Sequence, residues 1–336
     1  KQLAAAGLDD FYRGDIGREI AADLAAMGAP ITRADVEAYS ARIVEPLSLK
    51  LDELTVYNFP PPTQGLASLL ILGIFEKLGV TRAEGFDHHH GLVEAVKRAF
   101  AIRDRHITDP AHLTADPASF LTDAVFAREA AAIDRKRAAP WPPRPGNGDT
   151  IWMGAIDGSG MAVSYIQSLY WEYGSGCVLP KTGIHWQNRG VAFSLDRKAV
   201  NPLTPGRKPF HTLNPAFARF SDGRILSYGA MGGDGQPQFQ AQILSRYRFG
   251  QSLAGAVDAP RWLLGKTWGA GSVSLKLESR FDPMLLARLT AAGHPVEEYS
   301  EAYSDQFGHA GMLLKHPRGE VEATHDPRSD GDARGI

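Results

Sequence analysis

The sequence has very little cysteine, because Cys177 is the single cysteine in 336 residues and no disulfide can form within the chain. It also lacks any run of 18 apolar residues, the length that a membrane-spanning helix needs. A basic surplus is missing too, since 36 Lys and Arg stand against 38 Asp and Glu, for a net charge of -2. Nucleic-acid binding depends on such a surplus. We therefore expect neither a nucleic acid nor a membrane among its partners.

What is present is the composition of a protein with a sizeable core: 43% of the residues are hydrophobic and 22% are charged. A chain of this length predicts one large domain or two smaller ones. The sequence begins at Lys1, inside a helical pattern and without a methionine. We therefore expect a further N-terminal part to precede it in the whole protein.

Helical periodicity dominates the first part of the chain. Ile16, Ile20 and Leu24 form an apolar stripe that ends at Gly28, and Thr32 is a candidate N-cap for a second helix. Further helices are predicted at residues 66–78, 91–104 and 120–137, and a pair of strands at residues 43–58, with Leu47, Leu49 and Leu51 on one face.

The pattern changes after a stretch rich in proline and glycine at residues 138–148, which predicts a linker or an exposed loop. Residues 151–156 and 161–168 then have the pattern of two strands, joined by a DGSG turn. A second hairpin is predicted at residues 215–228, and helices at residues 236–249 and 283–292.

Thr150 stands directly after the linker, at the start of a predicted strand. If the bond between Asp149 and Thr150 is cut, Thr150 carries both a hydroxyl group and a free α-amine. The amine can then act as the base that removes the hydroxyl proton. Its position alone favours a threonine that merely begins a strand on a surface loop, so the catalytic interpretation depends on the other motifs.

Several of these motifs resemble those of gamma-glutamyltransferases. PPPTQG at residues 60–65 is similar to the family's PPPSSGG loop, and EAVKRAFAIRD at residues 94–104 to its EAxKRAxAxRD helix. Residues 150–168 follow the start of the family's small subunit: a nucleophilic threonine, a strand, an Asp-x-x-Gly turn and a second strand. Similar phrases follow in order: YGSG at 173–176, TGI at 182–184, NPLTPGRKP at 201–209, GG at 232–233 and DPRSDG at 326–331. The resemblance spans essentially the whole chain.

The resemblance implies an α+β fold, the four-layer αββα sandwich of N-terminal-nucleophile hydrolases. Residues 1–149 would be the C-terminal portion of a large subunit and residues 150–336 the small catalytic subunit, intertwined in one domain. Self-cleavage between Asp149 and Thr150 would make Thr150 the nucleophile. The backbone N–H groups of Gly232 and Gly233 would form the oxyanion hole. Ser168 would supply a second hydroxyl that bonds the nucleophile, although it could instead satisfy a buried backbone group.

The substrate-binding positions depart from the transferase pattern. Arg189 replaces a Glu or Gln, and Ala192 replaces the Asp that holds the α-amino group of glutamate. His211 and Thr212 replace the Ser-Ser pair that binds the glutamate carboxylate, and Tyr170 replaces an asparagine. A pocket that loses an acid and gains an arginine favours a carboxylate over an ammonium group.

One branch of the family, the oxamate amidohydrolases of purine breakdown, is similar in these places. GDTIWMG at 148–154 and SYIQSLYWEYGSG at 164–176 match its patterns. The resemblance implies hydrolysis of oxamate to oxalate and ammonia without a cofactor. Its partners would be a small amide substrate and its own two subunits, alone or as a dimer of heterodimers. The sequence does not give the localisation, and this branch of the family would favour the cytoplasm. A gamma-glutamyltransferase or glutathione hydrolase is the alternative, and a non-catalytic relative is a second one.

Two other features have simpler interpretations. Three consecutive histidines, His88, His89 and His90, cannot all face one metal ion from a helix or strand, so we expect them to pack or cap a helix rather than bind a metal. The glycine-rich residues 229–235 resemble a phosphate-binding loop but are not followed by Gly-Lys-Ser/Thr, which favours the oxyanion role.

Overall fold

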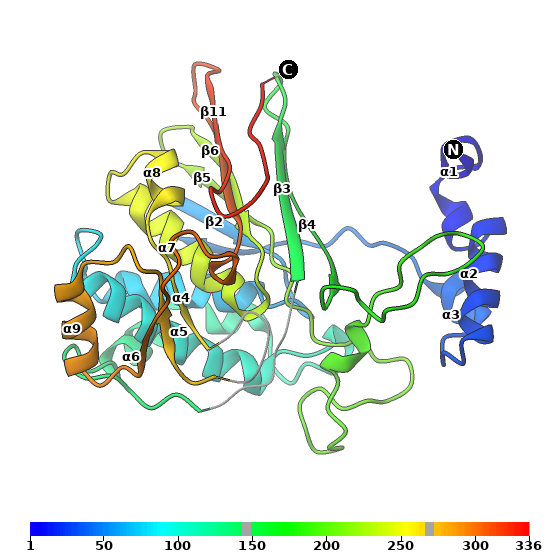
Figure 1. The fold of residues 1–336 in the computed structure, drawn as a ribbon, viewed down its shortest axis with the longest axis horizontal. Coiled ribbons are helices and arrows are strands. Elements are labelled where there is room, and N and C mark those ends of the chain that lie inside the picture. The colour runs from blue at the N-terminus through cyan, green and yellow to red at the C-terminus, as the bar shows by residue number, and fades with distance from the viewer. Residues whose placement is uncertain (143–148, 266–271, 336) are drawn as a thin grey trace. The chain divides into compact units, whose positions relative to one another are not determined.

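The computed structural model describes residues 1–142, 149–265 and 272–335 (Figure 1). Its helices are α1 (Gln2–Ala6), α2 (Asp15–Ala26), α3 (Arg33–Ala38), α4 (Gly65–Lys77), α5 (Phe86–His106), α6 (Asp123–Ala131), α7 (Gln236–Arg248), α8 (Leu253–Asp258) and α9 (Pro283–Ala291). Its strands are β1 (Leu47–Lys50), β2 (Leu54–Asn58), β3 (Asp149–Ile156), β4 (Ala162–Tyr170), β5 (Ala216–Phe220), β6 (Ile225–Ala230), β7 (Trp262–Leu264), β8 (Leu275–Leu277), β9 (Val296–Glu298), β10 (Ala310–Lys315) and β11 (Val321–Thr324). Within these residues, no helix is both long and apolar enough to cross a membrane.

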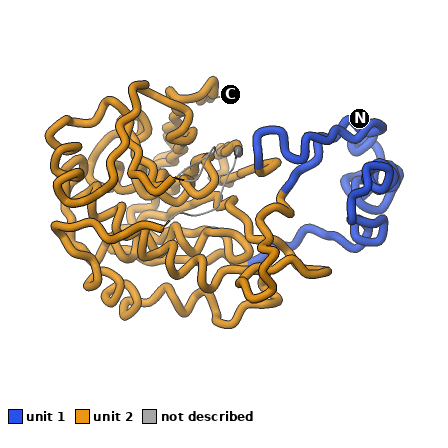
Figure 2. The backbone as a smooth tube through the Cα atoms, turned by 60° about the horizontal axis from the view of Figure 1, so that its bottom comes forward, with its two compact units in different colours: residues 1–44, 171–188 blue, residues 45–170, 189–336 orange. Residues whose placement is uncertain are grey.

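The chain divides into two compact units (Figure 2). The smaller unit consists of residues 1–44 and 171–188 and contains α1, α2 and α3. The predicted stripe of α2 is present, because Ile20 and Leu24 are buried against Leu179. Thr32 and Asp35 form a capping box at the start of α3, as the sequence predicted for this N-cap.

The larger unit, residues 45–170 and 189–336, contains a six-stranded antiparallel sheet in the order β1-β2-β5-β6-β10-β11. The predicted strand pair at residues 43–58 is confirmed as β1 and β2. β2 precedes the Asp149–Thr150 bond in sequence and β5 follows it, yet the two strands pair directly. The sheet is therefore built from both sides of the predicted cleavage site.

Helices cover one face of this sheet. α4 and α7 pack on the strands, and α5 packs against both helices (Figure 1). Nearly every residue of α4 is buried, which agrees with its apolar sequence on all sides. Alternation along β6 directs Leu226, Tyr228 and Ala230 into this core, since they share a hydrophobic cluster with α4 and α7.

The hairpin of β3 and β4 packs on the other face of the sheet. Trp152 of β3 lies flat against two glycines: a Cβ atom added to Gly229 would lie 2.1 Å from its ring, and one added to Gly311 would lie 2.3 Å from it. The hydroxyl of Ser227 donates to the carbonyl of Val163 at 2.8 Å, and that of Ser164 to the carbonyl of Tyr228 at 3.3 Å. Small residues on the sheet thus allow the two layers to approach closely.

Some predicted boundaries are wrong. The helix expected at residues 91–104 begins earlier, at Phe86, because Gly85 is extended and Asp87 lies in the first turn. The three histidines therefore lie inside α5, where they are buried, and not before it. The helix expected at residues 120–137 is shorter: Thr122 caps α6, which ends at Ala131. Within the predicted linker, residues 143–148 lie outside the described residues.

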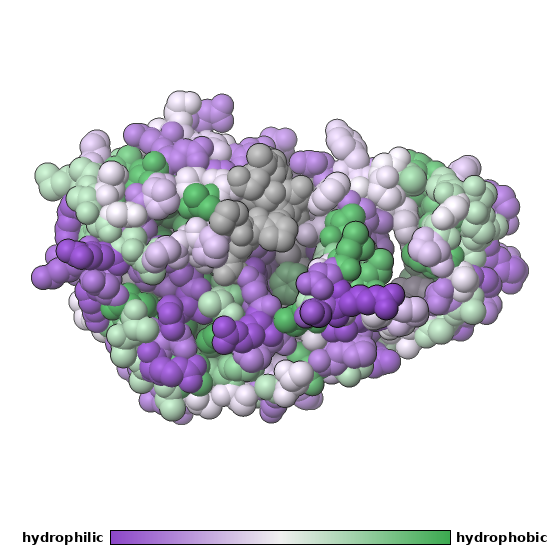
Figure 3. All heavy atoms as spheres, turned by 90° about the horizontal axis from the view of Figure 1, so that it is seen from below, coloured by the Kyte–Doolittle hydropathy of each residue, from purple (hydrophilic) through white to green (hydrophobic). Residues whose placement is uncertain are grey.

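The surface is mixed in character. On the face drawn in Figure 3, hydrophobic groups are separated by hydrophilic residues wherever the atoms are coloured. The outer side of the β3–β4 hairpin is more apolar. Its exposed side chains there are Ile151, Met153, Met161, Val163 and Tyr165.

The Trp152 contact yields a test of the layer packing. We expect Gly229→Ala to lower the free energy of unfolding by about 1–3 kcal/mol, because the new methyl group would overlap the indole ring. Gly158→Ala is the matched control, since no atom lies within 4 Å of its added Cβ. Urea denaturation of both variants measures the difference. Equal stability of the two variants would show that the indole can move aside without cost.

Candidate active site

Thr150 lies at the start of β3 and is buried. Asp149 pairs with Tyr170 and Ile151 with Gln167, so the register shifts by one residue at Thr150. Ile151 is 53% exposed whereas Thr150 is 8% exposed, which places the Thr150 side chain on the sheet-facing side of the hairpin. Trp152 shares this side, as strand alternation requires.

Ser168 is four residues after Ser164, which contacts the sheet, and alternation puts both hydroxyls on the same side of β4. The Ser168 hydroxyl oxygen accepts a hydrogen bond from the backbone N–H of Tyr170 at 2.8 Å. Tyr170 has φ of 86°, which is uncommon for a residue other than glycine. β4 therefore ends in a strained turn that holds the Ser168 hydroxyl and buries the Tyr170 ring.

The ends of β4 and β6 lie at the same end of the sandwich. Along β4, Val163 and then Ser164 contact Ser227 and then Tyr228 of β6, so the two strands run in the same direction where they cross. β4 continues to Ser168, next to the start of β3, and β6 continues to the Gly232–Gly233 pair. The fold thus brings Thr150, Ser168 and the glycine pair toward one end of the layers.

The glycine pair has a conformation that other residues rarely adopt, with φ of 121° at Gly232 and 52° at Gly233. The N–H of Gly235 donates to the carbonyl of Gly232 at 2.7 Å. In a trans peptide the N–H and C=O groups point in opposite directions, so this bond aims the N–H of Gly233 away from the turn. Within the described ranges, no backbone carbonyl accepts a hydrogen bond from the N–H groups of Gly232 and Gly233.

The electrostatic surroundings favour an anion at these N–H groups. The turn Gly233–Gly235 leads directly into the 13-residue helix α7, whose first residue is Gln236. The N-terminus of a helix carries a partial positive charge and unpaired N–H groups. An oxyanion held at this turn would therefore be stabilised by both.

The predicted substrate-binding residues lie close to one another. Arg189 Nη1 donates to the Thr212 hydroxyl at 3.1 Å, and the guanidinium carbon of Arg189 lies 4.1 Å from the centre of the Tyr170 ring. Burial lowers the pKa of Arg189 to about 10, so the side chain remains a cation at neutral pH. Burial, and then the charge of Arg189, lowers the pKa of His211 to about 3, so His211 is neutral. Among Tyr170, Arg189, His211 and Thr212, the buried positive charge is therefore that of Arg189.

The buried Gln64 and Arg103, with the half-buried Asp234, connect these two parts of the site, and none of them was predicted as a site residue. Gln64 donates to the carbonyls of Thr212 at 2.7 Å and Gly233 at 2.8 Å, and accepts from Arg103 at 2.8 Å. Arg103 also binds both carboxylate oxygens of Asp234, at 2.9 and 3.2 Å. Gln64 and Arg103 belong to PPPTQG and EAVKRAFAIRD, two motifs that served only to identify the resemblance.

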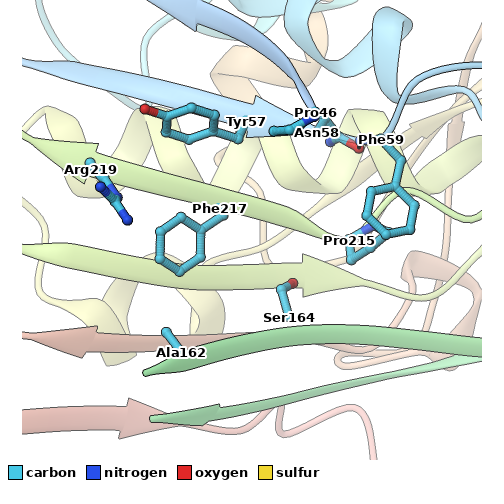
Figure 4. A pocket seen from close by; sticks show the side chains of 9 residues that line it. All are labelled: Pro46, Tyr57, Asn58, Phe59, Ala162, Ser164, Pro215, Phe217 and Arg219. Carbon is cyan, nitrogen blue, oxygen red and sulfur yellow. Dashed lines mark hydrogen bonds between the residues drawn. The ribbon is translucent and has the colours of Figure 1, made fainter. Parts of the chain in front are cut away.

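A cavity of about 450 Å³ opens on the hairpin side of the sheet, between β2, β5 and β4 (Figure 4). Its lining residues are Pro46, Tyr57, Asn58, Phe59, Ala162, Ser164, Pro215, Phe217 and Arg219. None of the predicted catalytic or substrate-binding residues lines it. We therefore assign no catalytic or substrate-binding role to this cavity.

One buried group of residues has the donor atoms of a metal site: His90, Glu94 and His294, whose donor atoms lie within 4.8 Å of one another. His90 and His294 already share a hydrogen bond of 2.8 Å, and the Lys97 ammonium group lies 2.6 Å from the Glu94 carboxylate. A metal ion would have to displace Lys97, which already supplies a cation. Lys97 and Glu94 also bond the backbone of Ala139, which gives the group a structural role.

Comparison with known proteins identifies the fold and the family of the chain. The larger unit is α+β, and the fold is the four-layer αββα type of N-terminal-nucleophile hydrolases, as predicted. The described residues supply a helical layer, the six-stranded sheet and the β3–β4 hairpin. The family model for gamma-glutamyltranspeptidase matches residues 1–336, and the chain belongs to this family.

Three relatives illustrate the similarity. The chain is 52% identical over its full length to an oxamate amidohydrolase proenzyme of Klebsiella pneumoniae, of which it covers 63%. It is 38% identical over 99% of its length to the glutathione hydrolase-like YwrD proenzyme of Bacillus subtilis, of which it covers 64%. A crystal structure of cephalosporin acylase from Bacillus halodurans superposes with a TM-score of 0.88 at 32% identity, over 99% of this chain and 61% of that one. The chain spans a little under two thirds of the length of these relatives.

The buried histidine generates a prediction on pH. The folded-state pKa of His211 is lowered from 6.5 to about 3, so between these values the unfolded chain binds a proton that the folded chain does not. Stability must fall as the pH drops through this window. His211→Gln should therefore lose less stability than the unmodified protein between about pH 7 and pH 4, by an amount on the order of 1–3 kcal/mol.

Urea unfolding at several pH values measures this effect. His112→Gln, at an exposed histidine, is the control and should behave like the unmodified protein. Parallel curves for the unmodified protein and His211→Gln would contradict a neutral, buried His211.

Proposed function

We propose that the whole protein is a self-processing amidohydrolase with an N-terminal threonine nucleophile, and that it hydrolyses oxamate to oxalate and ammonia. The observation that carries the choice of substrate is the buried Arg189 cation, which bonds Thr212 and lies on the Tyr170 ring. The 52% identity to an oxamate amidohydrolase proenzyme supports it.

Maturation begins with attack of the Thr150 hydroxyl oxygen on the carbonyl carbon of Asp149. The C–N bond breaks as the ester forms, which frees the α-amine of Thr150. Water then hydrolyses the ester, which releases the Asp149 carboxylate and restores the Thr150 hydroxyl. The two fragments remain associated, because β2 of the first pairs with β5 of the second. A dimer of such heterodimers is the assembly that the family resemblance implies.

In the mature protein the Thr150 α-amine takes the proton of the Thr150 hydroxyl as its oxygen attacks the amide carbon of the substrate. The N–H groups of Gly232 and Gly233 hold the oxyanion, and Ser168 bonds the nucleophile. The C–N bond breaks and ammonia leaves with the proton from the amine. Water, activated by the same amine, then hydrolyses the ester and releases oxalate.

Recognition of a carboxylate follows from the charge of the pocket. A guanidinium group binds the two oxygens of a carboxylate, and the Thr212 hydroxyl and neutral His211 offer further polar groups beside it. An α-ammonium group of a gamma-glutamyl substrate would meet the positive charge of Arg189. Ala192 stands where the transferases carry the acid that pairs with this ammonium group.

Self-cleavage is tested with Thr150→Ala. Loss of the hydroxyl removes the attacking atom, so full-length protein should remain one chain, whereas the unmodified protein should give two fragments with the second beginning at Thr150. Thr150→Ser keeps the atom and should cleave, more slowly. Intact-mass spectrometry of all three proteins gives the answer. A cut before residue 150 in the alanine variant would assign cleavage to another group or to a protease.

The substrate is tested by comparing kcat/KM for oxamate and for a gamma-glutamyl anilide on the processed full-length enzyme. We expect a preference for oxamate of about 100-fold or more, because an unpaired ammonium group in a closed pocket costs a few kcal/mol. Arg189→Gln combined with Ala192→Asp should lower oxamate turnover and raise the gamma-glutamyl activity. Equal or faster turnover of the anilide by the unmodified enzyme would instead identify a gamma-glutamyltransferase or glutathione hydrolase.

A further inference from the structure

Gln64 joins the two halves of the candidate site through a single buried amide group. It precedes α4 and is 0% exposed. Its nitrogen donates one hydrogen bond to the carbonyl of Thr212 and one to that of Gly233, at 2.7 and 2.8 Å. The main chain reinforces the first link, since the N–H of Gln64 donates to the carbonyl of His211 at 3.0 Å and the N–H of His211 to that of Pro62 at 2.8 Å.

The orientation of the Gln64 amide is fixed by chemistry. Arginine has donors and no acceptor, so the oxygen of the amide must face Arg103. The carbonyls of Thr212 and Gly233 have no donor, so the NH₂ group must face them. The reverse orientation would leave every one of these contacts between two donors or two acceptors.

Arg103 is itself held in place. It is 4% exposed, lies 3.8 Å from the centre of the Phe100 ring, and binds Asp234 with two nitrogens. Asp234 follows Gly233 in the sequence. The carbonyl of Gly233 is bonded by Gln64, and the side chain of Asp234 is bonded by Arg103, which also bonds Gln64. The turn at residues 232–235, which would hold the oxyanion and is called the oxyanion turn below, is therefore held in place by residues of α5 and of the segment just before α4.

This arrangement constrains the distance between two functions. Because the carbonyl oxygens of Thr212 and Gly233 both lie within 2.8 Å of one nitrogen, they cannot be more than twice that distance apart. The side chain of Thr212 belongs to the carboxylate pocket, and the N–H of Gly233 to the oxyanion hole. The spacing between the group that would bind the carboxylate and the group that would bind the oxyanion therefore depends on the Gln64 amide.

We propose that Gln64, held by Arg103, is a positioning residue that sets the spacing between the carboxylate pocket and the oxyanion hole. It thereby selects amides whose carboxylate is bonded directly to the amide carbon. The inference rests on the proposed function and adds the residue that determines substrate length. Gln64 acts through the backbone of Thr212 and Gly233.

The experiment compares oxamate with malonamate, which has one methylene between carboxylate and amide, on full-length enzyme with rates expressed per cleaved molecule. Gln64→Glu keeps the shape but loses both donors, and Gln64→Asn keeps the amide on a side chain too short to reach both carbonyls. The matched control is Gln242→Glu, because Gln242 is also buried and its nitrogen also donates to two backbone carbonyls. These belong to Gln238, one turn earlier in α7, and to Trp262 in β7.

We expect each Gln64 variant to lower kcat for oxamate by about 10-fold or more and to reduce the ratio of kcat/KM for oxamate over malonamate by at least about 5-fold. Gln242→Glu should lower stability and leave that ratio unchanged. Self-cleavage of both Gln64 variants should also slow, whichever amide the mature enzyme prefers, because it uses the same oxyanion turn.

The outcomes separate the two proposals. If the unmodified enzyme fails to hydrolyse oxamate, the proposed substrate is wrong; Gln64 is then judged as a positioning residue by the self-cleavage rate. If the unmodified enzyme hydrolyses oxamate but both Gln64 variants keep its substrate ratio and its self-cleavage rate, Gln64 is structural and the inference is overturned.

Discussion

The contact of Trp152 with Gly229 and Gly311 is the constraint on which the candidate site depends. An indole ring can lie flat on the sheet only where neighbouring strands carry no Cβ atom. This contact fixes the height and direction of the β3–β4 hairpin. Thr150 stands two residues before Trp152, and Gly232 three residues after Gly229. A packing contact between layers therefore determines where Thr150, the proposed nucleophile, lies relative to the turn that would stabilise charge.

Negative charge would be stabilised in two different ways at this end of the sandwich. The turn at Gly232 and Gly233, as proposed, would hold an oxyanion with backbone dipoles at the start of α7 and would need no charged side chain. The neighbouring pocket uses a full charge, that of Arg189. Burial lowers the pKa of Arg189 but leaves it protonated at neutral pH, while the same burial keeps His211 neutral. Within the described group of Tyr170, Arg189, His211 and Thr212, the positive charge comes from Arg189, which suits a substrate with a carboxylate.

Much of the fold could be predicted from local patterns, because alternation, capping residues and turns act over a few residues. The DGSG turn, the strand pair at residues 43–58 and the cap at Thr32 are of this kind. Tertiary packing decided the rest. The histidines of α5 are polar residues that became buried by bonding other parts of the chain, such as His90 with His294, and no local pattern predicts such a partner.

In the candidate site, too, local patterns indicated some residues, and tertiary contacts were needed to find the others. Motif order led to the prediction of catalytic roles for Thr150, Ser168 and the glycine pair, because each sits in a recognisable strand or turn, and these roles stay predictions. Gln64 was missed because its partners, Thr212 and Gly233, are more than 140 residues away in the sequence. A glutamine in a proline-rich loop carries no sign of such a contact. Only the three-dimensional structure shows that one amide joins the pocket to the turn.

The central claim is that the Thr150 hydroxyl attacks a substrate held by the pocket around Arg189. Acid quenching of the processed full-length enzyme during turnover of oxamate, followed by mass spectrometry, tests it most directly. The account predicts a fraction of the small fragment that carries one oxalyl group, attached to Thr150. Ammonia release with the small fragment always unmodified, or with the group on another residue, would contradict it.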